Sequence, residues 1–311
     1  MSEKIHNFVV EETDSNIRID KYLAEMDEVF PDFEFYTRTY IQKLIKDENV
    51  LVNSKPVKPS YPVVTGDNIQ VTIPKPLTVD VPARDIPLDI VYEDNDLLVV
   101  NKPKGMVVHP AAGHTDNTLV NALLFHCKDN LSSINGVLRP GIVHRIDMDT
   151  TGLLVVCKNN NSHQFLSEQL KEHSITRKYE AIVYNHFRHE SGTVNAPIAR
   201  NPKNRKQMGI VPGGKEAVTH YRIISNLKGN YSHIECELET GRTHQIRVHM
   251  ASIQHPLVGD IVYGPENKLA KTLQGQTLHA RTLGFIHPTT KEYMEFTSPL
   301  PEYFEKLLNT L

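Results

Sequence analysis

The segment 141–152, GIVHRIDMDTTG, concentrates ionisable side chains between two glycines and runs into the apolar stretch 153–156. A loop fixed at the end of a strand is a common place for catalysis, because the sheet holds the loop in position. Asp147 follows Arg145 by two residues, so both side chains point to one side of an extended backbone. A neighbouring guanidinium favours the ionised carboxylate. We therefore expect Asp147 to act as a nucleophile or electrostatic group, and not as a general acid.

An ordinary loop is the alternative interpretation of this segment. Arg-x-Asp pairs are common in loops, and Asp149 followed by two threonines could form a turn without any further role. The segment alone favours catalysis only weakly, so the rest of the chain has to decide between the two interpretations.

The segment 240–250, TGRTHQIRVHM, is a second cluster of cationic and polar residues. Gly241 indicates a turn, and Thr243 is expected to cap a helix that starts there. On that helix His244 and Arg247 are three residues apart and share a face. The pattern predicts that Arg247 supplies a fixed cation to an anionic catalytic centre.

This cluster could have two other roles. His244 and His249 are five residues apart, which fits poorly with the four-residue spacing of zinc ligands on a helix, so we expect no metal. Arg242 and Arg247 could also bind a structural carboxylate or phosphate and take no part in chemistry.

Two more basic segments favour contact with nucleic acid. Tyr179 follows Arg177 and Lys178 and could stack on a base, or lie in the core beside a basic pair whose ends reach solvent. The run 200–206 could be a solvated loop, but we expect it to contact phosphates. Its cations are Arg200, Lys203, Arg205 and Lys206.

Composition describes an ordinary globular protein with polarised charge. The chain has 311 residues, 39% hydrophobic and 23% charged, and a net charge of −3. Residues 186–311 carry 15 basic and 11 acidic side chains, whereas residues 1–80 carry 9 and 14. A local basic surface matters more for an RNA partner than the total charge.

The cysteines and the apolar runs restrict the compartment. Cys127, Cys157 and Cys236 are scattered and form no CxxC pair, which argues against a disulfide framework or a thiolate zinc site. Cys157 and Cys236 lie in apolar runs and are expected to be buried. Neither a signal-peptide pattern nor a membrane-length apolar run is present, so we expect a cytoplasmic protein with no membrane partner.

A proline-rich segment predicts two domains. Residues 74–87 contain four prolines, which favour extended backbone over helix. We expect a small domain at 1–74, a linker at 75–87 and a larger domain at 88–311.

The small domain is expected to contain a helix near 37–46 and strands at 50–53 and 68–73. Arg38, Gln42 and Lys46 share one face of that helix. The face could simply be solvated, but we expect Arg38, Lys43 and Lys46 to contact an RNA backbone.

Strand and helix patterns alternate in the larger domain. Strands are expected at 97–100, 179–184 and 231–238, and helices at 119–125, 162–173 and 301–311. The period-two alternation of the later strands is typical of antiparallel pairing with one covered face. The chain is therefore expected to be α+β, with a mixed, largely antiparallel sheet and flanking helices.

The N-terminal region resembles the RNA-binding domain first recognised in a small-subunit ribosomal protein. The matching residues are 19–23, 38–45, 50–53 and Gly66-Asp67. The loop 27–34 is acidic, and Asn49 stands where such domains usually have glycine.

Together the motifs resemble the large-subunit ribosomal RNA pseudouridine synthases of the RluA/RluD type. The resemblance rests on residues 96–103 with Gly105, on 144–152, on 177–183 and on 241–249. It implies that Asp147 is the catalytic aspartate, paired with Arg247. It also implies that Tyr179 packs on the target base and that Arg145 helps displace or replace the flipped uridine. His144 and Arg242 are expected to contact RNA.

The resemblance implies an isomerase acting on uridines, with large-subunit (23S) ribosomal RNA as its partner. Pseudouridylation conserves composition and needs no redox step, so no cofactor or metal is expected, and we expect a monomer. Two other classes stay open. A non-catalytic RNA-binding assembly factor would not need Asp147, and a glycosidic hydrolase would need a second carboxylate, for which Asp149 is the near candidate.

Overall fold

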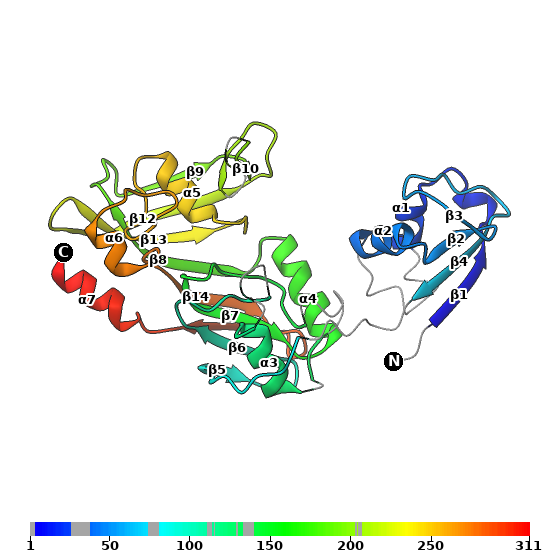
Figure 1. The fold of residues 1–311 in the computed structure, drawn as a ribbon, viewed down its shortest axis with the longest axis horizontal. Helices are drawn as coiled ribbons and strands as arrows, with labels where there is room; N and C mark the ends of the chain where they lie inside the picture. Colours follow the sequence, from blue (N-terminus) through cyan, green and yellow to red (C-terminus); the bar gives the residue numbers. More distant parts are fainter. Residues whose placement is uncertain are drawn as a thin grey trace. The chain divides into compact units, whose positions relative to one another are not determined.

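The structure is a computed structural model that describes residues 4–25, 38–73, 81–110, 114, 116–128, 130–132, 140–202, 204 and 207–311. The chain divides into two compact units, shown as a ribbon in Figure 1. The smaller unit contains the N-terminal elements through β4, and the larger contains the elements from β5 onward. The expected linker lies partly outside the described residues, and the domain bounds stay a prediction.

The smaller unit is a four-stranded antiparallel sheet with helices packed on it. Its strands run in the order β1-β4-β2-β3. Residues of α2 at helical spacing and alternate residues of β4 form its core, as their apolar periodicity predicted. The elements are β1 (Lys4–Val9), η1 (Glu12–Asp14), α1 (Ile19–Tyr22), η2 (Leu23–Glu25), α2 (Arg38–Lys46), β2 (Val50–Val52), β3 (Lys55–Pro56) and β4 (Asn68–Ile73).

The larger unit is built on a nine-stranded sheet in the order β5-β6-β7-β14-β8-β13-β12-β9, with β15 paired to β14. All pairs are antiparallel except β7 with β14, which is parallel. The predicted α+β class and the mixed, largely antiparallel sheet are therefore confirmed. The strands are β5 (Ile90–Glu93), β6 (Leu97–Lys102), β7 (Thr151–Cys157), β8 (Thr176–Tyr184), β9 (Ser191–Asn195), β12 (Val218–Leu227), β13 (Tyr231–Leu238), β14 (Leu278–Ile286) and β15 (Tyr293–Thr297).

Helices flank this sheet (Figure 1), and those expected at 119–125, 162–173 and 301–311 lie within two residues of those bounds. None of the described helices is long and apolar enough to cross a bilayer. All three cysteines are free and buried, as expected for Cys157 and Cys236. The helices are α3 (Leu119–Cys127), α4 (Asn160–Lys171), α5 (Gln245–Ser252), α6 (Lys268–Leu273) and α7 (Glu302–Thr310), and a separate hairpin pairs β10 (Ile198–Arg200) with β11 (Met208–Ile210).

Strand β7 is the central support of the larger unit. All seven of its residues are buried, and its apolar side chains pack with residues of α4 and β14. Gly152 has φ +110°, and a side chain there would meet the backbone of Ala280 at 2.3 Å. Only glycine fits that conformation and that close approach to β14. The loop that carries Asp147 leads directly into this strand.

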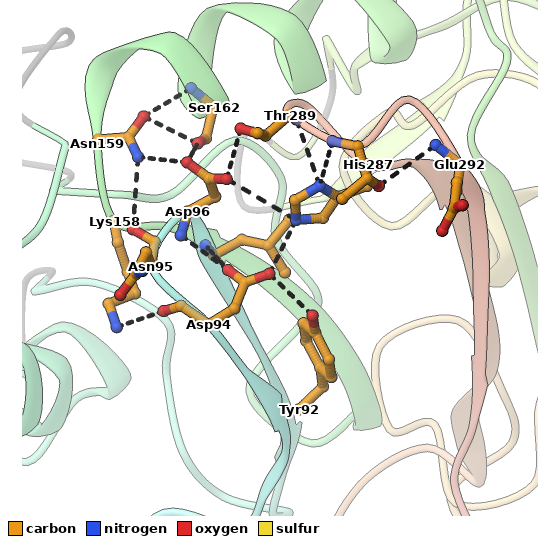
Figure 2. Close-up of polar contacts among 12 residues, drawn as sticks. Tyr92, Asp94, Asn95, Asp96, Lys158, Asn159, Ser162, His287, Thr289 and Glu292 are labelled. Carbon is orange, nitrogen blue, oxygen red and sulfur yellow. Dashed lines mark hydrogen bonds and ion pairs between the residues drawn. The ribbon is translucent and has the colours of Figure 1, made fainter.

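A hydrogen-bonded network lies at the other end of β7, where it pairs with the start of β6 (Figure 2). Asp94 accepts hydrogen bonds from the hydroxyl of Tyr92, from the backbone N–H of Leu97, and from Nε2 of His287. Nδ1 of His287 accepts from the backbone N–H of Thr289, which places the ring proton on Nε2.

The same network joins the β5–β6 turn to α4 and to the β14–β15 loop. Asp96 accepts from the side chains of Asn159 and Thr289 at 2.8 and 2.6 Å. Ligand atoms of Asp94, Asp96 and His287 lie within 4.8 Å of one another, but each of them already takes part in a hydrogen bond described above. This network therefore holds together the β5–β6 turn, the start of α4 and the β14–β15 loop.

Candidate active site

A pocket of about 440 Å³ lies beside the loop that enters β7. Its walls come from that loop, from the end of α4, from β8, and from the segment between β13 and α5. Three of these walls, the loop, β8 and the segment before α5, contain charged segments that the sequence singled out. Sites of this size bury most of a nucleobase-sized ligand.

Asp147 stands in this pocket beside Arg247. Nη1 of Arg247 donates to Oδ2 of Asp147 at 2.8 Å. Burial alone would lower the pKa of Arg247, but the hydrogen bond and charge of Asp260, and then those of Asp147, raise it above its ordinary value. Asp147 therefore faces a permanent cation. Arg145, the guanidinium that sequence proximity suggested, instead hydrogen-bonds the ring of His109 at 3.1 Å.

Asp260 fixes the orientation of Arg247. Its side chain is fully buried and accepts from Nε and Nη2 of Arg247 at 2.6 and 3.0 Å. Its Oδ1 also accepts from the backbone N–H groups of Val262 and Tyr263. A two-point contact of this kind sets the plane of a guanidinium as well as its position. The remaining nitrogen of the guanidinium, Nη1, is thereby directed at Asp147.

The start of α5 differs from the prediction. Thr243 does not cap the helix: His244 occupies the N-cap position with left-handed backbone (φ 56°) and makes no side-chain capping bond. Its ring instead turns towards the pocket. Nε2 of His244 lies 3.9 Å from Oδ1 of Asp147, and Nδ1 lies 2.8 Å from the hydroxyl of Tyr263. His244 and Arg247 therefore both approach Asp147, although only Arg247 lies within the helix.

A buried lysine anchors the loop that carries Asp147. Nζ of Lys102 donates to the carbonyl oxygens of Pro103, Met106 and Met148 at 2.7 to 2.9 Å. Burial lowers the pKa of Lys102 to about 7, although the charges of Asp149 and Asp147 act in the opposite direction. Because Met148 lies next to Asp147, this ammonium group anchors the loop at the residue beside the carboxylate.

Asp149 faces away from the pocket. It is absent from the residues that line the pocket, and a side chain at Gly275 would meet its carboxyl group at 2.6 Å. Burial raises the pKa of Asp149 above its ordinary value, while Lys104 and Lys102 lower it. The second carboxylate that a hydrolase would need is therefore not provided by Asp149 in this arrangement.

Strand β8 brings Tyr179 and Arg177 to the pocket wall. Both side chains are 7% exposed. Burial raises the pKa of Tyr179, so its hydroxyl keeps its proton. Nη2 of Arg177 donates to the carbonyl of Glu239 at 2.8 Å, while its Nε has no hydrogen-bond partner among the described residues. Tyr179 thus offers an aromatic surface beside an incompletely paired cation.

The pocket is strongly cationic. Among the described residues that line it, Asp147 is the only acid. The ring of His144 is neutral, because burial and the charge of Arg177 lower its pKa to about 3, and its Nε2 accepts from the backbone N–H of Val155. Such a charge distribution suits a polyanion. The cations are Arg145, Lys171, Arg177, Arg242 and Arg247.

The expected RNA-contacting residues outside the pocket lie on exposed surfaces where they are described. Lys43 and Lys46 are exposed on α2, and Arg200 is exposed at the end of β10. Arg242, at the pocket, donates from Nε to the carbonyl of Glu216. The remaining cations of the basic run, Lys203, Arg205 and Lys206, lie outside the described residues.

Arg38 is part of an ion-pair cluster in the smaller unit. It shares the fully buried carboxylate of Asp20 with Arg18, and both guanidinium groups are about half exposed. Burial of Asp20 works against ionisation, but hydrogen bonds from Arg18, Gln42 and Arg38 lower the pKa of Asp20 to about 2. One buried carboxylate therefore holds two cations at the surface.

Sequence reasoning did not single out Asp260, Tyr263 or Lys102. A signal for the first two is present in the segment 259–264, GDIVYG, in which an acid and a tyrosine lie between glycines. Lys102 sits in a strand-like run and carries no local signal for its role. Of its three partners, Pro103 and Met106 follow it closely, whereas Met148 lies 46 residues away in the sequence.

Comparison with known proteins defines the family. Residues 96–252 match the RNA pseudouridylate synthase family, and residues 34–69 match the S4 domain family. The chain therefore belongs to the RNA pseudouridine synthases and carries an N-terminal S4 domain. Its family makes it an isomerase that converts uridine to pseudouridine in RNA.

Similar proteins cover nearly the whole chain. An uncharacterized RNA pseudouridine synthase of Bacillus subtilis, YlyB, is 51% identical over 294 residues, 94% of each protein. Ribosomal large subunit pseudouridine synthase D of Salmonella typhimurium is 44% identical over 97% of this chain and 93% of that protein. The solved structure of human RNA pseudouridylate synthase domain containing 1 has a TM-score of 0.57 and 26% identity, over 74% of this chain and 96% of that one.

Proposed function

We propose that this protein isomerises uridines in large-subunit (23S) ribosomal RNA, with Asp147 as the catalytic carboxylate. The observation that carries the proposal is that Arg247 holds Asp147, the only acid among the described residues of an otherwise cationic pocket. Relatives named ribosomal large subunit pseudouridine synthase D support the choice of RNA, including one from Zymomonas mobilis that is 54% identical over 81% of this chain and 82% of that protein.

The reaction breaks the bond between C1′ and N1 of uridine and forms a bond between C1′ and C5. The ribose carbon becomes electron-poor as the bond breaks, and an ionised carboxylate stabilises such a centre in glycoside chemistry. The carboxylate of Asp147 supplies that charge, either by adding to the sugar or by taking a proton from it. Arg247 holds the carboxylate in position.

The uridine has to leave its stack to reach this carboxylate, which costs a few kcal/mol. Stacking on the ring of Tyr179 returns about 1–3 kcal/mol of that cost. Arg145 is exposed at the pocket mouth and fills the place that the base vacates. These are the roles that the sequence resemblance implied, and they remain proposals.

Contacts with the RNA backbone extend the site beyond the pocket. Cations of α2 (Arg38, Lys43, Lys46), of the pocket (Arg242) and of the run 200–206, together with the neutral ring of His144, bind phosphates or sugars, which positions the RNA without reading its sequence. The proposed active form is a monomer. Because ribosomal RNA is the proposed substrate, the cytoplasm is the proposed compartment.

The test is release of tritium from large-subunit ribosomal RNA made without modification and labelled at C5 of uridine. The parent protein is expected to release tritium, and Asp147→Asn, which is nearly isosteric, is expected to release none while binding RNA within about tenfold of the parent, or ~1.4 kcal/mol. No release by the parent would refute the proposed substrate.

The same variant separates the two other classes. An assembly factor would keep its cellular function in the Asp147→Asn variant. A hydrolase would liberate free uracil, which chromatography of the reaction mixture detects. Appearance of pseudouridine in the digested RNA, without free uracil, identifies the isomerase.

A further inference from the structure

His244 is a pocket residue to which the catalytic scheme above gives no role. Its side chain is 23% exposed, and its Nε2 lies 3.9 Å from Oδ1 of Asp147, which is too long for a hydrogen bond. No other described residue lies within hydrogen-bonding distance of this nitrogen. The ring is therefore held at the carboxylate with one nitrogen still available to a ligand.

The hydrogen bonds behind the ring assign its proton. The hydroxyl of Tyr263 accepts from the backbone N–H of Met208 at 2.9 Å, and its own proton then points to Nδ1 of His244 at 2.8 Å. An imidazole that accepts at Nδ1 carries its proton on Nε2. The donor of His244 therefore faces the pocket.

The ring is neutral and rigidly held. Burial lowers the pKa of His244 below its ordinary value, with Arg247 and Arg145 acting in the same direction and Asp147 and Asp260 against it. The ring packs edge-on against Tyr263. The ring centroid of the same tyrosine lies 5.0 Å from Cζ of Arg247. One aromatic side chain therefore contacts both groups that approach Asp147.

We propose that the Nε2–H of His244 donates a hydrogen bond to the uracil while the base is detached from the ribose. When the C1′–N1 bond breaks, its electron pair stays on uracil, and the negative charge spreads over N1, O2 and O4. The base turns so that C5 faces C1′ and bonds to it. The C5 proton then passes to water and N1 takes up a proton from water, so the whole reaction is balanced. His244 keeps its own proton throughout.

A neutral imidazole suits this role for a physical reason. A fixed donor aimed at developing charge stabilises the transition state without reorganising, and removal of one such donor typically costs about 100- to 1000-fold in rate. A neutral ring also leaves the charge balance between Asp147 and Arg247 undisturbed. His244 would thus act on the base while Asp147 acts on the sugar.

This inference rests on the proposed role of the pocket around Asp147, and its test uses the full chain with transcribed large-subunit ribosomal RNA. His244→Asn suits the left-handed backbone, which asparagine tolerates, but its shorter amide does not reach the base. We expect a single-turnover rate about 100-fold below the parent, with RNA binding unchanged. His244→Gln restores a longer donor and is expected to recover part of the loss. His189→Ala, at an exposed histidine outside the pocket, is the control.

A second substrate distinguishes this role from a structural one. In RNA transcribed with 5-fluorouridine, fluorine itself stabilises the detached base, so the donor matters less. The loss caused by His244→Asn, measured as disappearance of the intact nucleoside, is expected to be at least tenfold smaller on this RNA, that is, at least ~1.4 kcal/mol less. Equal losses on both RNAs, or a parent-like rate on uridine, would overturn the proposal.

Tyr263→Phe tests the assignment of the proton. Loss of the hydroxyl frees the proton of His244 to move to Nδ1, so a smaller rate loss is expected in this variant. The double variant with His244→Asn is expected to be no slower than His244→Asn alone, because Tyr263 acts through His244. Additive losses would refute that coupling. An inactive parent would instead refute the proposed substrate and leave the role of His244 to be measured on another RNA.

Discussion

Replacement of Asp260 by asparagine tests whether the orientation of Arg247 limits the reaction. Asparagine can keep one oxygen to accept from the backbone N–H groups of Val262 and Tyr263. Its amide nitrogen then replaces Oδ2, which accepts from Nε of Arg247 at 2.6 Å in the parent. Two donors would face each other at that distance, so the guanidinium has to move.

The size of the effect follows from these contacts. A hydrogen bond to a charged group contributes about 1.5–3 kcal/mol, and unpairing a buried ion pair costs about 3–5 kcal/mol. Because the amide keeps part of the network, we expect Asp260→Asn to lose ~3 kcal/mol of stability. A displacement of about 1 Å at a catalytic group costs on the order of 100-fold in rate, and we expect a loss of that order.

The assay is single-turnover tritium release at saturating RNA, with urea unfolding of the same preparations. Asp94→Asn is the matched control, because it also removes a carboxylate that accepts several hydrogen bonds, but at the far end of β7 (Figure 2). It is expected to lower stability and leave the rate unchanged. A rate for Asp260→Asn within about threefold of the parent, or equal rate losses in both variants, would refute the reasoning.

Three further predictions concern stability. The pKa of Asp20 is about 2 in the folded protein, against an ordinary value of 3.8. Asp20 therefore contributes ~2 kcal/mol to the free energy of unfolding above pH 4, and this contribution is lost as the pH falls towards 2. Hydrogen exchange in β4 should differ between the parent and Asp20→Asn at pH 5 but not at pH 2. Burial lowers the pKa of His163 and His279 to about 4. As the pH falls, these rings become protonated in the unfolded chain before they do in the folded protein. The free energy of unfolding therefore falls by about 1.4 kcal/mol per pH unit for each ring between pH 6.5 and pH 4. Urea unfolding at several pH values should show this slope, and His279→Gln should reduce it. Lys102→Met removes the side-chain donor of three carbonyl groups, of which that of Met148 keeps the backbone N–H of Gly105. We therefore expect a loss of about 2–4 kcal/mol in urea unfolding and a rate more than tenfold lower; a parent-like rate would contradict the anchoring role.

Local periodicity was sufficient for most of the fold. The alternation in 231–238 predicted β13 with its observed bounds, and the two-turn pattern near 162–173 placed α4 to within two residues. The start of α5 could not be predicted in the same way. Thr243 has the chemistry of a cap, but the tertiary contact of His244 with Tyr263 holds the backbone in another conformation there.

The site was predictable only where its residues carry a local pattern. Asp147 and Arg247 lie in distinctive segments, and the resemblance implied their pairing, which the structure places at 2.8 Å. The ion pair of Arg247 with Asp260, which orients Arg247 towards Asp147, was not predictable, because it depends on how the chain folds back after α5. The same holds for Lys102, since nothing next to it in the sequence indicates that three carbonyl groups converge on its ammonium.

The complete burial of β7 has a consequence for how the enzyme responds to heat. Amides in a strand that is covered on every residue exchange with solvent only when the whole unit opens. The Asp147 loop is joined directly to this strand, and Lys102 anchors it in addition. The catalytic geometry should therefore survive local fluctuations of the surrounding loops. On heating, activity is expected to persist up to the melting transition of the larger unit and then to disappear together with it.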